Sequence, residues 1–172
     1  VWNGPMDTII GLGKSSLKFD GVNDYVKKAD SSTRPDAITV ETWIKMDTLK
    51  NYNSIFGWGP VDAGVNGTEL YVNSSGTVTF RVRSGSGTNE RIRNSASNIS
   101  AGQWYHIAAT QTAIAATPSI YINGSLSNGT ATEETPTAVS GDKYIGYGVI
   151  QQTYFGGLID EVRVSNIART PE

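Results

Sequence analysis

The sequence predicts an all-β protein built as a two-sheet antiparallel jelly-roll sandwich. Apolar and polar residues alternate with a period of two along much of the chain, whereas the helical period is nearly absent. The short apolar runs are separated by glycine, asparagine and serine, the residues that form turns. The 172 residues include 19 glycines without a fixed period, which is typical of many turns rather than of collagen. Many short strands punctuated in this way favour a sandwich or jelly roll.

The first half of the chain offers five strands, at residues 16–19, 24–26, 38–44, 69–72 and 77–83. The last of these is the clearest, because Val78, Phe80 and Val82 share one face while threonines and arginines share the other. In the third, aliphatic residues face one way and Trp43 the other, so both faces are expected to be covered. The fourth ends in Asn73-Ser74-Ser75-Gly76, a hairpin-type turn.

The second half offers four more strands, at residues 104–110, 119–122, 143–147 and 157–164. The first is entered through the turn Ala101-Gly102-Gln103. The second runs into Asn123-Gly124, the strongest short-range hairpin signal in a sequence. The glycine-rich stretches 51–68, 84–98 and 130–142 are interpreted as longer loops, where binding residues concentrate on a rigid β scaffold.

Composition narrows the functional classes. A net charge of −2 argues against attraction of nucleic acid, and no apolar run approaches the roughly 20 residues that span a bilayer, so membrane insertion is not expected. The chain has no cysteine, which excludes disulfides, thiolate metal sites and a cysteine nucleophile. A surface rich in serine, threonine and asparagine favours a secreted or cell-surface protein. Residues 1–172 are expected to form one domain, joined to other domains in a longer parent protein.

Three segments carry a family resemblance through their order and spacing. They are residues 16–26, residues 102–108 with 120–124, and residues 155–164. Together they resemble the laminin G-like, pentraxin-related branch of the concanavalin A-like lectin/glucanase superfamily, from Ser16 to Arg169. The resemblance implies a non-catalytic carbohydrate-binding or adhesion module that meets a glycan or another cell-surface ligand. The alternative is a structural or protein-adhesion module of a surface layer or fibre, with no sugar site.

The arrangement of carboxylates and the single histidine argue against catalysis. Glycoside hydrolysis requires two carboxylates at a fixed separation across the scissile bond, and the retaining glucanases of the superfamily carry theirs as Glu-X-Asp-X-Glu on one strand. No such run occurs here, since Glu133 and Glu134 are adjacent and Glu41 stands alone. His106 has no nucleophile-elbow motif beside it and is interpreted as a packed, hydrogen-bonded side chain. We therefore predict no catalytic residue and no enzyme activity.

A structural calcium ion is the predicted cofactor. Asp20, Asn23 and Asp24 crowd a tight turn, and Asp160 has the strand parity of apolar neighbours, so its carboxylate is expected to point toward the core. A buried carboxylate needs a cation or several donors, and dense oxygen ligands suit calcium. The resemblance implies that Asp20 and Asp160 hold this ion, and Asn23 and Asp24, which crowd the same turn, are predicted as further ligands. In the alternative, Asp20 and Asp160 cap their own turns through hydrogen bonds to the backbone.

Sugar binding is expected to use an aromatic ring that stacks on the sugar, with amides or carboxylates for the hydroxyls. Trp58 lies between two glycines in the longest predicted loop, so it is either exposed for stacking or a plug over the end of the sandwich. In pentraxin-like relatives the segment at 148–154 is an acidic ligand-contacting loop, but here Gln151 and Gln152 replace the acids. The predicted ligand-binding residues are Tyr52, Trp58, Tyr147, Gln151, Gln152 and Tyr154.

Four arginines, Arg81, Arg83, Arg91 and Arg93, lie close together in the sequence. They are interpreted either as a solvated strand face or as a site for an acidic glycan.

Overall fold

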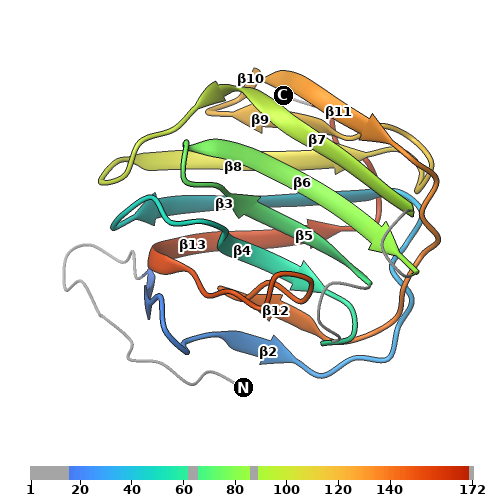
Figure 1. Ribbon diagram of the computed structural model, residues 1–172, viewed down its shortest axis with the longest axis horizontal. Coiled ribbons are helices and arrows are strands. Elements are labelled where there is room, and N and C mark those ends of the chain that lie inside the picture. The colour runs from blue at the N-terminus through green and yellow to red at the C-terminus, as the bar shows by residue number, and fades with distance from the viewer. Residues whose placement is uncertain (1–15, 62–65, 86–88, 171–172) are drawn as a thin grey trace.

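The computed structural model of the protein describes residues 16–61, 66–85 and 89–170. Within these ranges the chain forms β-strands and no helix, and so no helix that could cross a membrane (Figure 1). The strands are β1 (Leu17–Asp20), β2 (Val26–Lys28), β3 (Ile38–Met46), β4 (Asn53–Trp58), β5 (Gly67–Val72), β6 (Thr77–Ser84), β7 (Asn89–Asn98), β8 (Trp104–Gln111), β9 (Ser119–Ile122), β10 (Ser125–Leu126), β11 (Asn128–Glu133), β12 (Lys143–Ile145) and β13 (Gly156–Ser165).

The strands form two antiparallel sheets that pack face to face (Figure 1). The six-stranded sheet has the order β1-β13-β3-β8-β9-β10, and the seven-stranded sheet has the order β11-β7-β6-β5-β4-β12-β2. The last strand lies between two of the earliest, since β13 pairs with β1 on one side and with β3 on the other. The prediction of an all-β, two-sheet antiparallel sandwich is therefore confirmed.

The core lies between the two sheets and consists of their inward side chains. Val78, Phe80 and Val82 of β6 are fully buried, as the alternation predicted, and share one hydrophobic cluster with Ile44 of β3 and Ile107 of β8. Burial of this surface drives folding, at about 25 cal/mol per Å² of apolar area. Alternate residues of the same strands point outward, so an outer sheet face that no other segment covers is available for a binding site.

Three stretches that the sequence predicted to be loops contain strands. Residues 51–68 include β4, residues 84–98 include β7, and residues 130–142 include most of β11. β4 shows no alternation because all of its residues are buried, one face in the core and the other beneath the segment that follows β12. β7 and β11 lie at one side of their sheet and are rich in serine, threonine and asparagine, so their composition resembles that of a loop.

A β-bulge in β13 reverses the predicted orientation of Asp160. The register shifts just after this residue, where Glu161 has a positive φ of 49°. Ile159 is the inward residue, at 1% exposed, so Asp160 points outward, opposite Trp43 of β3. The prediction that the Asp160 carboxylate points toward the core is therefore wrong. The prediction assumed unbroken alternation from Asp160 through Val162, but the bulge interrupts the alternation there.

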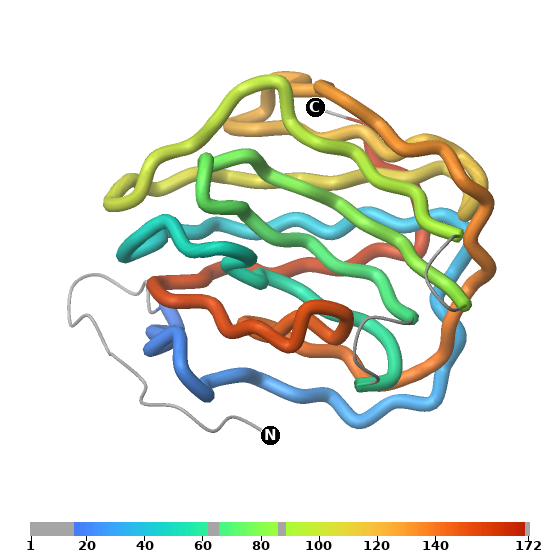
Figure 2. Tube along the Cα trace, in the orientation of Figure 1, coloured from blue at the N-terminus to red at the C-terminus, as the bar shows by residue number. Residues whose placement is uncertain are grey.

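The segment between β12 and β13, residues 146–155 and here called the covering loop, folds over the outer face of the seven-stranded sheet (Figure 2). Val149 and Ile150 of this loop are buried. The loop approaches the strands so closely that a Cβ on Gly57 of β4 would lie 2.7 Å from the carbonyl oxygen of Tyr147. Glycine is therefore required in the middle of a buried strand, which also explains why β4 does not have the composition of one.

A buried carboxylate anchors the covering loop. Glu69 of β5 accepts hydrogen bonds at Oε1 from the amides of Ile150 (2.5 Å) and Gln151 (3.1 Å). Its other oxygen, Oε2, has no hydrogen-bond partner among the described residues. Burial is the main cause that raises the pKa of Glu69, because the charged carboxylate loses its hydration there.

The four clustered arginines do not form one surface. Arg81 is buried and pairs with Glu90, its Nη2 lying 2.5 Å from Oε2. Arg91 is also buried and donates to Thr117 Oγ1 (3.3 Å), while Arg93 donates to the carbonyl of Pro118, and both acceptors lie just before β9 of the other sheet. Arg91 and Arg93 join the two sheets at one side of the sandwich. The predicted solvated face does not exist.

Candidate functional site

The covering loop brings together four of the predicted ligand-binding residues. Tyr147 and Tyr154 form an isolated β-bridge, with ring centroids 4.9 Å apart, and Gln151 and Gln152 lie between them in the chain. Both tyrosine rings also pack against Tyr25. Tyr147 is 8% exposed, and burial, followed by the nearby Tyr154, raises its pKa to about 12. Its ring is enclosed by other tyrosines, whereas Tyr154 and Gln151 are half-buried and Gln152 is exposed.

The other two predicted ligand-binding residues, Trp58 and Tyr52, lie outside this group. Trp58 is the last residue of β4, is 4% exposed and belongs to the core, so of its two predicted alternatives exposure for stacking is wrong, and its burial agrees with the other, a plug. The ammonium of Lys143, opposite it on β12, lies 3.9 Å from the centre of an indole ring that therefore offers no free face on that side. Tyr52 packs its ring against Tyr71 of β5, with centroids 5.3 Å apart.

The three predicted calcium ligands at the first turn lie together. Asp20 Oδ1 accepts hydrogen bonds from the amides of Val22 (2.7 Å) and Asn23 (3.2 Å). Asp24 Oδ2 accepts one from the amide of Asp20 (3.0 Å). The hydrogen bond from Val22 is the main cause that lowers the pKa of Asp20, and the positive charge of Lys50 contributes in the same direction. Backbone donors thus already engage the Oδ1 atom of Asp20.

Asp160 lies apart from that turn. The register of β1 and β13 places Asp20 opposite Gly156, which is about 13 Å along the strand from Asp160 at roughly 3.3 Å per residue. One ion held by both Asp20 and Asp160 is therefore incompatible with the register. Asp160 Oδ1 instead accepts a hydrogen bond from the amide of Glu161 (2.8 Å), and both aspartates make the kind of backbone hydrogen bond that the capping alternative predicted. In the described ranges, no cluster of three or more histidine, cysteine, aspartate or glutamate side chains could hold a metal.

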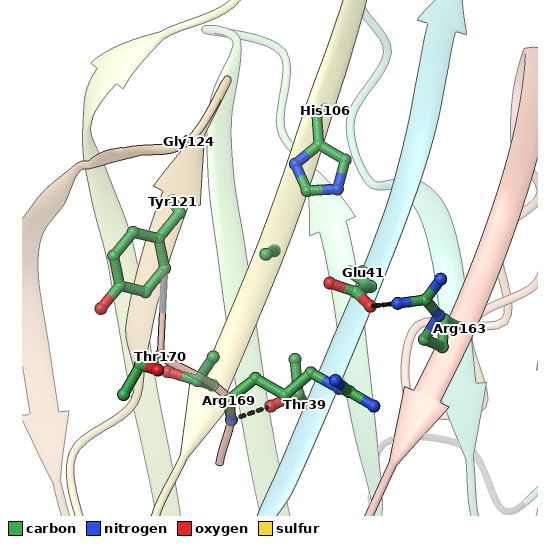
Figure 3. Close-up of a pocket in the computed structure, with 10 residues that line it drawn as sticks. Thr39, Glu41, His106, Tyr121, Gly124, Arg163, Arg169 and Thr170 are labelled. Carbon is green, nitrogen blue, oxygen red and sulfur yellow. Dashed lines mark hydrogen bonds and ion pairs between the residues drawn. The ribbon is translucent and has the colours of Figure 1, made fainter. Parts of the chain in front are cut away.

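A hollow of about 310 Å³ lies on the outer face of the six-stranded sheet (Figure 3). This volume is at the lower end of the range of ligand pockets, about 300–1,000 Å³. In Figure 3, Tyr121 stands on one side of the hollow, Glu41 and Arg163 on the other, and His106 at one end. We call it the sheet hollow, and its lining residues are Thr39, Glu41, His106, Ala108, Thr110, Tyr121, Gly124, Arg163, Arg169 and Thr170.

One row of side chains crosses four strands at the centre of the sheet hollow. Tyr121 of β9 lies opposite Ala108 of β8, which lies opposite Glu41 of β3. On its other side, Glu41 lies opposite Arg163 of β13. Opposed residues on antiparallel strands have Cβ atoms only about 4.5–5.5 Å apart. The small Ala108 side chain therefore leaves a gap between a tyrosine ring and a charged pair.

The charged pair supplies both hydrogen-bond acceptors and donors. Arg163 Nη1 lies 3.0 Å from Glu41 Oε1. The two are not aligned as a hydrogen bond, so this buried oxygen of Glu41 has no donor among the described residues. The Arg163 side chain is 65% exposed, and its guanidinium presents further N–H donors to the solvent. Of two neighbouring hydroxyl groups on a ligand, one can donate to the carboxylate while the other accepts from the guanidinium.

Two exposed tryptophans continue the outer face beyond the sheet hollow. Trp43 of β3 is 37% exposed and lies opposite His106, with ring centroids 5.4 Å apart. Trp104 of β8 is 39% exposed and lies opposite Lys45, two residues further along the strands. The prediction that the third strand is covered on both faces is therefore wrong at Trp43. Large exposed aromatic rings on one face are a typical sign of a binding surface.

Sequence reasoning missed this site because it sought ligand-binding residues in loops. The signal lay in the strands, where Glu41 and Trp43 alternate with core residues on β3, as Trp104 and His106 do on β8. Alternation shows that these side chains leave the core. Only the pairing of β3 with β8 and β13 brings them to one place, and that pairing joins strands far apart in the sequence.

The two antiparallel sheets place the chain in the class of jelly-roll β-sandwich domains. Residues 20–172 match the family described as the Concanavalin A-like lectin/glucanases superfamily, and the chain belongs to this family. No curated protein sequence matches the chain. The resemblance to the laminin G-like, pentraxin-related branch is confirmed.

Solved structures with the same fold include three at low sequence identity. Domain 4 of AbnA, an extracellular arabinanase from Geobacillus stearothermophilus solved with arabinotriose, is 22% identical, covering 98% of this chain and 79% of its own, with a TM-score of 0.68. A heptameric pentraxin from Limulus polyphemus is 21% identical, covering 90% and 76%, with a TM-score of 0.63. The CBM40 of a Ruminococcus gnavus sialidase bound to α2,3-sialyllactose is 12% identical, covering 86% and 92%, with a TM-score of 0.66. At these identities the likeness shows the fold.

Proposed function

We propose that this domain is a non-catalytic carbohydrate-binding module whose ligand occupies the sheet hollow. The observation that carries the proposal is the meeting, on one sheet face, of exposed Trp43 and Trp104 with the ring of Tyr121 and the pair of Glu41 and Arg163. Aromatic rings offer an apolar surface for the C–H face of a sugar. The charged pair offers acceptors and donors for its hydroxyls.

The solved relatives support a glycan ligand and a place in a larger protein. The arabinanase domain is described in complex with arabinotriose and the sialidase CBM40 in complex with sialyllactose, and each is part of an enzyme. The arabinanase is described as extracellular. By the same reasoning we propose that this domain works outside the cell and is joined to other domains.

The composition of the sheet hollow supports binding without turnover. Among the described residues that line it, Glu41 is the single carboxylate, whereas glycoside hydrolysis by the common routes uses a pair. We expect the domain to bind its glycan and release it unchanged. Incubation with a bound oligosaccharide followed by mass analysis checks this, and shortened products in the wild type but not in Glu41→Gln would contradict it.

A glycan array tests the binding proposal directly. Tyr121→Ala and Trp43→Ala should each weaken binding by about tenfold or more, because they remove rings at the proposed site. Tyr52→Ala, in the turn before β4, and Tyr154→Ala, in the covering loop, are matched controls and should bind normally. Loss of binding only in Tyr154→Ala would move the site to the covering loop. A wild-type domain that binds no glycan would favour the protein-adhesion alternative.

We propose that any structural calcium is confined to the first turn, at Asp20, Asn23 and Asp24. The support is that Asp20 and Asp24 lie together in this turn, where the amide of Asp20 donates to Asp24 Oδ2, since calcium prefers carboxylate and carbonyl oxygen. The melting temperature of the wild type should then rise with calcium and fall with chelator, and Asp20→Asn should abolish the difference. Equal melting temperatures of the wild type under both conditions would exclude the ion.

A further inference from the structure

The sheet hollow is closed at one end by the chain itself. Thr39 Oγ1 donates a hydrogen bond to the carbonyl of Ile167 and accepts one from the amide of Arg169, both at 2.8 Å. Arg169 Nε in turn donates to Ser165 Oγ at 2.8 Å. These bonds hold the segment after β13 against the start of β3, where Arg169 and Thr170 line the hollow (Figure 3). The wall is thus fixed by hydrogen bonds to the sheet.

The opposite end of the sheet hollow is bordered by His106, and from there aromatic rings continue along the sheet face (Figure 3). Moving away from Thr39 along β3 and β8, the pair Trp43 and His106 follows the centre of the hollow, and the pair Lys45 and Trp104 comes next. Successive pairs on one face are about 6.6 Å apart, two residues along the strand. The exposure of both tryptophans leaves their rings available along this path.

Both flanks of the sheet hollow are occupied by side chains. Tyr121 of β9 stands on one flank, and Arg163 of β13 on the other, held beside Glu41 (Figure 3). The floor between them is Ala108, which is 8% exposed. A ligand that enters the hollow is therefore bounded on both flanks and at the Arg169 end, and extends toward the tryptophans.

We infer that the domain recognises the end of a linear glycan, with the terminal sugar in the sheet hollow and the next two sugars over Trp43 and Trp104. The inference rests on the proposed function and adds the mode of binding. Arg169 and Thr170 block a chain that continues past the hollow, so an internal stretch cannot fill it. The ligand class is accordingly a polysaccharide or oligosaccharide without branches on its first three units.

The dependence of affinity on the length of the oligosaccharide tests the proposed placement of sugars over Trp43 and Trp104. Linear arabinan, xylan and mixed-linkage glucan are screened by affinity electrophoresis, and oligosaccharides of two to six units from each are titrated by calorimetry. The affinity should rise up to the trisaccharide and then stay level. Trp104→Ala should weaken trisaccharide binding by about tenfold and leave disaccharide binding within about twofold. Trp43→Ala should weaken both. Each variant is first shown to have the wild-type melting temperature.

The number of binding sites per mass of polysaccharide tests recognition of the end. Partial hydrolysis of a retained polysaccharide multiplies its ends at constant mass, so the number of bound domains should rise in proportion to the ends. A number of bound domains that does not change on hydrolysis would overturn the inference. An equal loss of affinity for the disaccharide and the trisaccharide in Trp104→Ala would overturn it as well. In either case binding persists, so the proposed function stands. A wild type that binds neither these probes nor any arrayed glycan fails the proposed function itself.

Discussion

Two tryptophans of this chain, Trp58 and Trp104, have opposite environments although each ends or begins a strand. Trp58 fills the core beside Lys143, whereas Trp104 lies on an outer face and is 39% exposed. Trp58→Ala should lower the free energy of unfolding by about 3–5 kcal/mol, because it leaves a cavity in the core. Trp104→Ala should change it by no more than about 0.5 kcal/mol. Urea unfolding followed by circular dichroism measures both, and similar losses would contradict the assignment of Trp104 to a surface.

Glu69 makes the stability of the domain depend on pH. Its pKa is raised above the ordinary value of 4.5, so the folded protein holds this proton more tightly than the unfolded chain. The stability of the wild type should therefore fall as the pH rises from about 4.5 through the raised pKa of the folded state. Glu69→Gln keeps the Oε1 acceptor for Ile150 and removes the charge, so at pH 7 it should raise the free energy of unfolding by about 1 kcal/mol.

The stability gain of Glu69→Gln over the wild type should disappear at a pH where the Glu69 carboxyl of the wild type is protonated in both the folded and the unfolded state. Urea unfolding at pH 7 and at pH 4 compares Glu69→Gln with the exposed control Glu134→Gln, which should behave as the wild type at both values. A Glu69→Gln protein that is less stable than the wild type at pH 7 would show that the attraction of the Glu69 charge to Arg81 outweighs the cost of its burial.

Among the elements, the covering loop depends on close backbone contact. A Cβ on Gly148 would lie 2.5 Å from Ser54 Oγ and 2.7 Å from Glu69 Oε1. Gly148→Ala should therefore cost about 1–3 kcal/mol of stability through overpacking. Gly156→Ala, at the first residue of β13 directly after this loop, is the matched control, because its Cβ would meet atoms only at ordinary contact distance and should cost little. Thermal unfolding of the two variants measures the difference, and equal melting temperatures would contradict close packing of the loop.

Elements with one covered face were predictable from the sequence, and elements with two covered faces were not. β6 showed its inward side through Val78 and Phe80, whereas β4 is buried on both sides and contains Gly57, so its pattern resembles a loop. The orientation of Asp160 depended on a bulge that alternation cannot reveal. The candidate site needed the register between distant strands, which no local pattern contains.

At the scale of the whole molecule, the class of fold followed from turns and alternation because these act on every strand at once. The closure of the six-stranded sheet, in contrast, depends on one strand, β13. A chain that ends at Phe155 lacks β13 and leaves β1 and β3 without their shared partner. We expect it to show no cooperative thermal transition by circular dichroism, whereas a chain that ends at Thr170 should unfold as the wild type does. A sharp transition in the shorter chain would contradict this dependence.

The position of β13 between β1 and β3 also bears on how the protein is made. During synthesis, β1 and β3 leave the ribosome long before the strand that separates them, so their edges and apolar faces stay uncovered while the other strands assemble. The six-stranded sheet can close only when β13 emerges. Until β13 has emerged, a nascent chain of this kind is exposed to chaperones and proteases, and a ribosome that stalls before β13 would release a sandwich with an open sheet.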